Sequence, residues 1–190
     1  MFVSFSVGNT GPFKEVTGIT TVCESLKKEF LGKNTFEVGG HNYNKISYIY
    51  GANGSGKTNF LSALTKMQKM IIMSTVLGAN NNKLLEVPAI KKELASPIET
   101  FKFDVDCKSR ETFFEIQVLL EGILYSYSFA VQDGKIQREL LTKKNKRTEI
   151  LIKRTSPKYE DILLRSGLAS FKGMVTVVRD DALCLAMAAM

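Results

Sequence analysis

Residues 51–58, Gly-Ala-Asn-Gly-Ser-Gly-Lys-Thr, constrain the fold of this chain more than any other stretch. They fit the pattern G-x-x-x-x-G-K-[ST], a loop whose backbone N–H groups converge on nucleotide phosphates. Glycine at three of these positions permits positive φ and lets an anion approach the backbone closely. The sequence therefore predicts a phosphate-binding loop made of Gly51, Ala52, Asn53, Gly54, Ser55, Gly56, Lys57 and Thr58.

The last two residues of this loop carry its side-chain chemistry. Lys57 would reach the β- and γ-phosphate oxygens as a point charge, which makes it the candidate catalytic residue. The Thr58 hydroxyl would hold Mg²⁺, which makes it the candidate metal ligand. ATP and Mg²⁺ are therefore the expected cofactors.

The flanks of the loop support this interpretation. Residues 46–50, Ile-Ser-Tyr-Ile-Tyr, are short, β-branched and aromatic, which predicts a buried strand. A helix is expected from Thr58 to about Leu77, with its N-terminal N–H groups aimed at the phosphates. Apolar residues recur in it at helical spacing, namely Phe60, Leu61, Leu64, Met67, Ile71 and Ile72.

Length and composition indicate one ordinary globular domain, with 190 residues, 44% hydrophobic and 24% charged. The N-terminus lacks a basic segment followed by a long apolar run, and no apolar stretch could span a bilayer. We expect a cytoplasmic protein with no membrane partner. The net charge of +7 suits an anionic partner, either nucleotide or nucleic acid.

Cysteine and histidine usage argues against a metal site or a nucleophilic triad. The three cysteines, Cys23, Cys107 and Cys184, are widely separated, and His41 is the only histidine. We expect reduced thiols, and a histidine that simply follows a Gly-Gly turn.

Basic residues cluster at 143–147, Lys-Lys-Asn-Lys-Arg, with Lys153 and Arg154 just beyond. This cluster could contact a phosphate backbone. It could equally be the solvated tip of a hairpin, where charge prevents edge pairing, and we favour this second interpretation.

Alternating apolar and polar residues predict strands in two blocks of the chain. Near the N-terminus, strands are expected over 2–7 and 15–22, followed by a loop over 26–40. Farther along, a five-stranded antiparallel meander with one solvated face is expected. Its strands would cover 100–106, 113–120, 124–131, 136–141 and 149–154, with an Asp-Gly hairpin turn at 133–134.

The remaining segments are less regular. A stop and loop are expected at 78–82, and residues 83–97 are expected to be irregular or partly helical. Residues 174–178 would be extended, and residues 179–181 would cap a last helix over 182–190. The expected organisation is thus strands, loop and helix in 1–78, a linker in 79–98, the meander in 99–156, and a loop and helix in 157–190.

Hydrolysis would also require a carboxylate at the end of a neighbouring strand to hold Mg²⁺. Asp180 and Asp181 are the nearest candidates, but Arg179 interrupts the apolar run before them and Asp180 suits a helix cap. Asp104 and Asp106 are expected to face solvent on the meander. We therefore assign none of these acids to the metal and expect these 190 residues alone not to turn over ATP.

Several segments resemble ABC-type ATPase heads of the RecF- and SMC-like group. The resemblance is carried by "SFSVGNTGPF" and "ISYIYGANGSGKTNFLSAL", where the loop has Asn at 53 and continues to Asn59. The segments "SPIETFKFDV", "ILYSYSFAVQDGKIQRELL", "EILIKR" and "RDDALCLAMAAM" resemble stand-alone bacterial AAA/ABC ATPases. That subgroup lies close to the OLD-type, abortive-infection and PtuA-like anti-phage proteins.

The resemblance implies a P-loop ABC-ATPase-like α/β core sheet with a Walker A helix and an antiparallel β-meander subdomain. It implies that residues 51–59 bind phosphates and Mg²⁺ and that residues 9–13 lie near the adenine or ribose. It also implies that residues 1–190 are the N-terminal half of a head, because the Walker B acid, signature motif and switch histidine are not found. No Q-loop glutamine is assigned among Gln68, Gln117 and Gln132.

Three functions remain open at this stage. The first is an ATP-binding head that dimerises on ATP and controls a partner, such as a nuclease or another anti-phage effector. The second is a RecF- or SMC-like protein of DNA repair or chromosomes, and the third is a scaffold that binds nucleotide without hydrolysing it. The expected partners are a second head, the C-terminal half of the same head, an effector subunit and nucleic acid. A phosphate-loop kinase is less favoured, because the meander has no evident role as a lid.

Overall fold

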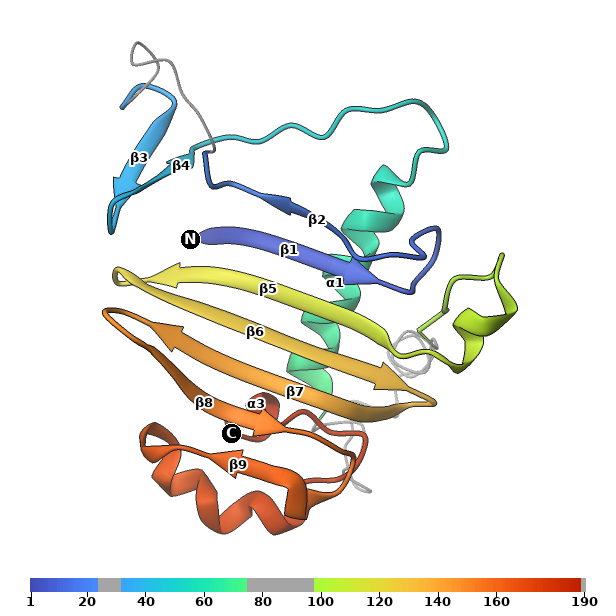
Figure 1. The fold of residues 1–190 in the computed structure, drawn as a ribbon, viewed down its shortest axis with the longest axis vertical. Helices are drawn as coiled ribbons and strands as arrows, with labels where there is room; N and C mark the ends of the chain where they lie inside the picture. The colour runs from blue at the N-terminus through green and yellow to red at the C-terminus, as the bar shows by residue number, and fades with distance from the viewer. Residues whose placement is uncertain (24–31, 75–97, 189–190) are drawn as a thin grey trace.

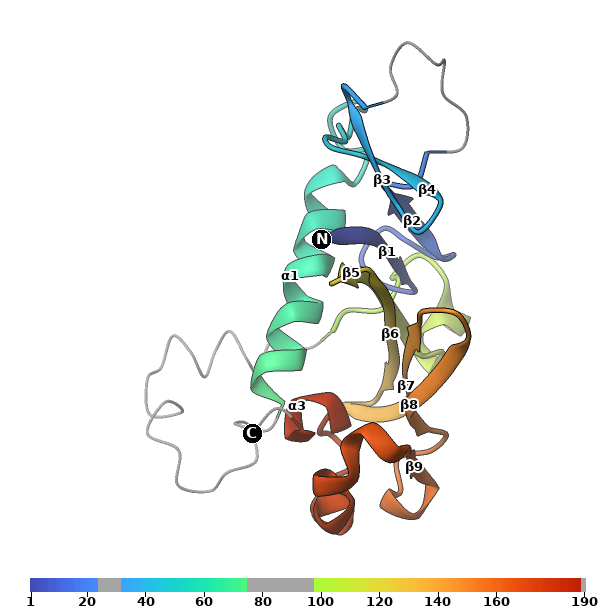
Figure 2. The ribbon, with the colours of Figure 1, turned by 90° about the vertical axis from the view of Figure 1, so that its left-hand side faces the viewer.

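The computed structural model describes residues 1–23, 32–74 and 98–188. Its centre is a seven-stranded antiparallel sheet of order β2-β1-β5-β6-β7-β8-β9, with the helices α1 (Lys57–Met73) and α3 (Cys184–Ala188) on one face (Figures 1 and 2). The strands are β1 (Phe2–Gly8), β2 (Thr17–Thr20), β5 (Thr112–Leu120), β6 (Ile123–Gln132), β7 (Lys135–Lys144), β8 (Thr148–Arg154) and β9 (Ile162–Leu164). The expected fold class, an α/β protein with a phosphate-loop helix and an antiparallel meander, is confirmed.

Smaller elements complete the described chain. A separate two-stranded hairpin is formed by β3 (Thr35–Val38) and β4 (His41–Asn44). The helices are α1 (Lys57–Met73), α3 (Cys184–Ala188) and the 3-10 segments η4 (Val105–Ser109), η5 (Tyr159–Asp161) and η6 (Ser166–Val177).

The meander follows the period-two pattern of the sequence. Strands β5 to β8 occupy the four segments expected between residues 113 and 154. Two-residue turns join β5 to β6 at Glu121-Gly122 and β6 to β7 at Asp133-Gly134, and all four residues have positive φ. Paired positive φ values match the right-handed twist of the flanking strands, so the Asp-Gly hairpin prediction is confirmed.

The N-terminal strand belongs to the same sheet as the meander. β1 pairs with β5 in antiparallel register, with Phe5 opposite Ile116 and Val7 opposite Phe114. The blocks expected as 1–78 and 99–156 therefore share one sheet and one core, although the end of β1 at Gly8 and the start of β5 at Thr112 lie more than a hundred residues apart in the sequence.

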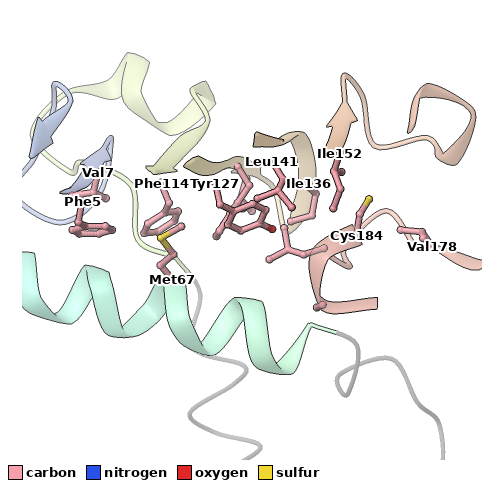
Figure 3. Packing of buried hydrophobic residues seen from close by; sticks show 14 of the residues in the cluster. Phe5, Val7, Met67, Phe114, Tyr127, Ile136, Leu141, Ile152, Val178 and Cys184 are labelled. Atoms are coloured by element: carbon pink, nitrogen blue, oxygen red, sulfur yellow. The ribbon is translucent and has the colours of Figure 1, made fainter. Parts of the chain in front are cut away.

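α1 covers one face of this sheet and buries a narrow apolar stripe against it. Its fully buried side chains are Phe60, Ala63 and Met67, and Met67 points at Phe114 (Figure 3). Two of the apolar residues expected on this stripe, Leu61 and Ile72, are instead exposed. At 100° per residue these two positions lie off the stripe that faces the sheet.

Two expected strands are not present. Residues 101–104 form a turn and η4 follows them, so the alternation over 100–106 does not correspond to a sheet strand. Asp104 and Asp106 accordingly lie off the meander, and Asp104 accepts a hydrogen bond from the Asp106 N–H at 3.0 Å. Residues 174–177, expected to be extended, belong to η6.

The strand expected immediately before the phosphate loop is also not formed. Residues 46–50 have no assigned secondary structure, and the exposed fraction reaches 85% at Tyr50. Within the ranges described, no strand pairs with this segment. Because strand propensity mainly reflects packing against neighbouring strands, an apolar segment without a neighbour does not form a strand.

Other differences are smaller. The second strand is shorter than the expected 15–22, and a strand, β3, lies within 26–40, which was expected to be a loop. The last helix starts at Cys184 rather than at residue 182. The expectations for 24–31, 75–97 and 189–190, including the end of the helix near Leu77, lie outside the described residues.

Two charged residues in adjacent strands are almost fully buried. Glu139 of β7 and Arg154 of β8 lie opposite each other, and each is 1% exposed. Arg154 donates hydrogen bonds to backbone carbonyls that include those of Ala182 at 2.8 Å and Ser156 at 2.9 Å. Arg154 therefore fixes the backbone before α3 and does not belong to the basic surface cluster in which the sequence placed it.

The rest of that cluster lies at the tip of the β7–β8 hairpin. Lys144, Lys146 and Arg147 are exposed, and Lys143 forms an ion pair with Glu149 at 3.1 Å. The structure thus places this cluster at a hairpin tip, a position that is compatible with both interpretations of its function. In the part of the chain described, no helix is long and apolar enough to cross a membrane.

Candidate functional site: a phosphate-binding loop

The loop that precedes α1 has the backbone conformation that its glycines predict. Gly54 has φ +83° and Gly56 has φ +89°, values that side-chain-bearing residues rarely adopt. A Cβ atom on Gly51 would lie 2.6 Å from the Ser55 hydroxyl oxygen, so a side chain at this position would displace that hydroxyl. The loop closes through a hydrogen bond from the Ser55 N–H to the Ala52 carbonyl at 3.2 Å.

The Lys57 ammonium group lies over the loop that precedes it. Its Nζ donates to the carbonyl oxygens of Gly51 and Ala52, each at 2.7 Å, and lies 3.4 Å from the Ser55 hydroxyl. The loop thus surrounds the Lys57 ammonium group on one side. The same geometry leaves the positive charge of Lys57 at the solvent-exposed opening of the loop, where an anion would bind.

The first turn of α1 leaves its positive end available. Gly56 is the N-cap residue, no side chain caps the helix, and no acidic residue lies in its first turn. Thr58 and Asn59 are exposed beside these free amides. Uncapped N-terminal N–H groups carry a partial positive charge and favour anions.

The turn after β1 packs against this loop. The resemblance placed residues 9–13 near the adenine or ribose, but it did not indicate that the turn contacts the loop at Gly56. A Cβ on Gly56 would lie 3.3 Å from Pro12 Cγ and 3.4 Å from Phe13 Cζ, so the turn touches the loop backbone. The Phe13 ring also meets the Phe60 ring edge-on, with centroids 6.0 Å apart. The sequence Asn-Thr-Gly-Pro at 9–12 is typical of a turn, but this local signal does not say which element the turn contacts.

A groove of about 590 Å³ lies beside this turn and is lined by both ends of the turn, η4 and the neighbouring strands. Its cations are largely paired. Lys14 contacts Asp104 at 2.7 Å, and Arg138 contacts Glu111 at 2.7 Å. The hydrogen bond from Lys14, together with that from the Asp106 N–H, lowers the pKa of Asp104.

The candidate magnesium acids are occupied by other partners. Asp180 forms an ion pair with Lys135 at 2.9 Å, and this contact lowers the pKa of Asp180. Asp181 forms an ion pair with Arg179 at 2.6 Å. Neither caps α3, whose Cys184 N–H is instead bound by Glu139 at 2.8 Å. Over the described ranges, no three His, Cys, Asp or Glu residues are grouped as a metal site.

The expected site residues therefore form one continuous surface. The nine positions from 51 to 59 lie around the Lys57 ammonium and the start of α1, and all are exposed or partly exposed except Gly56. This donor set fits a nucleotide phosphate, since it combines free backbone amides, one cation and glycines at the points of close approach. Thr58 is the residue that would hold Mg²⁺.

A comparison with protein families gives one match. The family described as "AAA domain, putative AbiEii toxin, Type IV TA system" matches residues 46–172, about two thirds of the chain, including the whole phosphate loop and the meander. No curated protein and no solved structure matches the chain.

Proposed function

The chain belongs to this family of AAA domains, and from that premise we propose that residues 51–59 bind the phosphates of Mg-ATP. Nucleotide binding of the ATPase type is the function that the family match supports. The assignment of individual residues rests on the loop itself.

The observation that carries this proposal is the position of Lys57. Its ammonium is held at 2.7 Å by two loop carbonyls, Gly51 and Ala52, at the open mouth of the loop. A bound triphosphate would offer this cation negatively charged oxygens in place of neutral carbonyls, and the attraction between opposite charges would favour the exchange. The free amides at the start of α1 would bind the same phosphates from the other side. Mg²⁺, held by Thr58, would neutralise part of the phosphate charge.

We further propose that the protein acts as an ATPase head that dimerises on ATP and controls an effector in bacterial anti-phage defence. The support is the resemblance of the chain to OLD-type and PtuA-like ATPases, together with a family description that names an AbiEii toxin. The exposed segment 46–50 would then require neighbouring strands, because an apolar strand of this kind is normally buried on both faces.

The Lys57→Ala variant tests nucleotide binding. We expect the full-length protein to lose most of its affinity for Mg-ATP in isothermal titration calorimetry, with an unchanged circular dichroism spectrum. Lys66→Ala is the matched control, because it removes the same charge from α1 about 13 Å farther along the helix. Wild-type affinity in Lys57→Ala would show that the site is assigned wrongly.

Dimerisation needs its own measurement. We expect the mass of the wild-type protein in light scattering to double when Mg-ATP is added, and we expect Lys57→Ala to remain monomeric. A wild-type mass that does not respond to Mg-ATP would count against the head-dimer proposal while leaving nucleotide binding intact.

One observation favours a second function, binding to nucleic acid. Three exposed cations at the β7–β8 tip, Lys144, Lys146 and Arg147, have the character of a phosphate-backbone contact. If they bind duplex DNA, replacing all three with alanine should reduce the slope of log K against log salt by about 3. An unchanged slope would identify the tip as a solvated hairpin.

A further inference from the structure

Asn9, directly after β1, is a buried hydrogen-bonding centre. It is 4% exposed and has φ +51°. Its side-chain amide donates to the carbonyls of Cys107 at 2.9 Å and Arg110 at 2.8 Å, and its side-chain oxygen accepts from the Phe101 N–H at 3.2 Å. One side chain thus joins the end of β1 to both sides of η4.

The turn that follows is tied to the same segment by its next two residues. The Thr10 hydroxyl donates to the Glu99 carbonyl at 2.9 Å, and the Gly11 N–H donates to the same oxygen at 3.2 Å. The turn closes on itself through reciprocal backbone hydrogen bonds between Thr10 and Phe13, at 3.0 and 2.9 Å. Its shape and its position are therefore both fixed.

The far side of this turn touches the phosphate loop at its pivot. Gly56 links the loop to α1 with φ +89° and ψ +3°, and Pro12 and Phe13 lie against it. The Phe13 ring contacts Phe60, which in turn meets Phe5 of β1 with ring centroids 5.2 Å apart. Gly56 is thus covered on one side by Pro12 and Phe13, although the loop residues before it are exposed.

We propose that Asn9 is a positioning residue for phosphate binding, and this inference rests on the proposed function. Asn9 need not touch the nucleotide. It holds the turn 10–13, and the turn restricts Gly56 to the conformation in which the loop amides converge. A loop held in its binding conformation spends less free energy on ordering when a ligand arrives.

The choice of asparagine at this position follows from two requirements. The positive φ disfavours most side chains, but asparagine and glycine tolerate it. Glycine would lose these side-chain hydrogen bonds. Aspartate would keep the size but would place carboxylate oxygens against two carbonyl oxygens, where only a donor is compatible.

The test is Asn9→Gly in the full-length protein, which keeps the backbone conformation and removes the anchor. Binding of Mg-ATP and of inorganic tripolyphosphate would be measured by calorimetry. We expect both dissociation constants to rise by about tenfold, because preorganisation of the loop serves the phosphates rather than the base. Asp133→Gly is the matched control. It removes a side chain at another residue with φ +51°, in the β6–β7 turn, and both affinities should be unchanged.

A local readout separates positioning from general stability. In hydrogen exchange, amides of residues 51–57 should exchange faster in Asn9→Gly, whereas amides of β5–β7 should keep their wild-type protection. Uniform loss of protection over the sheet would overturn the inference, as would a folded variant with wild-type affinity for both ligands.

A milder variant covers the case in which Asn9→Gly does not fold. Thr10→Val keeps the shape of the residue and removes only its hydrogen bond to Glu99. It should weaken both ligands several-fold, and unchanged binding would overturn the inference. If instead Lys57→Ala binds Mg-ATP normally, the proposed function fails, and it does so independently of Asn9.

Discussion

The buried carboxyl group of Glu139 should be among the most sensitive positions of this protein to a conservative change. It accepts hydrogen bonds from the Tyr127 hydroxyl at 2.8 Å, the Cys184 N–H at 2.8 Å and the Leu185 N–H at 2.9 Å. The Leu183 N–H is bound in parallel by the Ser74 hydroxyl at the end of α1. Glu139 therefore supplies the cap that joins α3 to the sheet.

Glu139→Gln removes the charge and keeps the volume. The amide of glutamine has one oxygen in place of two, so at least one donor loses its acceptor. An unsatisfied buried donor costs about 1–3 kcal/mol, and the remaining bonds lose their charge assistance. We expect the free energy of unfolding to fall by about 3 kcal/mol, which corresponds to a melting temperature lower by roughly 6–12 °C for a chain of this size.

The measurement is urea-induced unfolding followed by far-ultraviolet circular dichroism, with the denaturant slope compared between variants. Glu149→Gln is the matched control, because it makes the same change in the same hairpin at an exposed ion pair with Lys143. Surface pairs of this kind contribute less than about 1 kcal/mol. If Glu139→Gln and Glu149→Gln lose the same small amount, the capping role assigned to Glu139 is incorrect.

Three further results are expected. Gly56→Val should abolish Mg-ATP binding, because the backbone at this position has a positive φ and the new side chain would collide with Pro12 and Phe13. The control is Gly134→Val, which also places valine at a positive φ but faces open solvent, and it should retain affinity in the same titration. Stability should decline above about pH 9–10, because burial raises the pKa of Tyr127 and of Cys184, so the unfolded chain releases protons that the folded chain keeps. In thermal melts Tyr127→Phe should decline less steeply than wild type above pH 10, and an identical slope would contradict this reasoning. Residues 1–190 should not release phosphate from ATP, because Asp180 and Asp181 are held in ion pairs. Turnover that Asp180→Asn abolishes would show instead that Asp180 is a metal ligand.

Features that depend on neighbours in the chain were predictable from the sequence. The glycines of the phosphate loop and the two-residue turn at 133–134 specify backbone conformations by their own stereochemistry. The period-two pattern likewise predicted β5 to β8, because alternation reports which face of a strand is buried. The helix after the loop was predicted from the helical spacing of its apolar residues, although Leu61 and Ile72 were expected on the buried face and are exposed.

Tertiary structure decided the features that depend on distant partners. Residues 46–50 have strand composition but no neighbour to pair with in the described chain, whereas β1 pairs with a strand about a hundred residues away. Glu139 and Arg154 occupy core-facing positions in two adjacent strands whose apolar and polar residues alternate, and this alternation could have indicated that both side chains are buried. Most of their partners, however, are backbone groups at 156–185, which no local pattern reveals. Asn9 was visible only as part of a turn, since its role comes from hydrogen bonds to residues 101, 107 and 110. Local stereochemistry acts within a few residues along the chain. Apolar side chains and polar groups, in contrast, find their packing and hydrogen-bond partners among residues that only the folded chain brings close together.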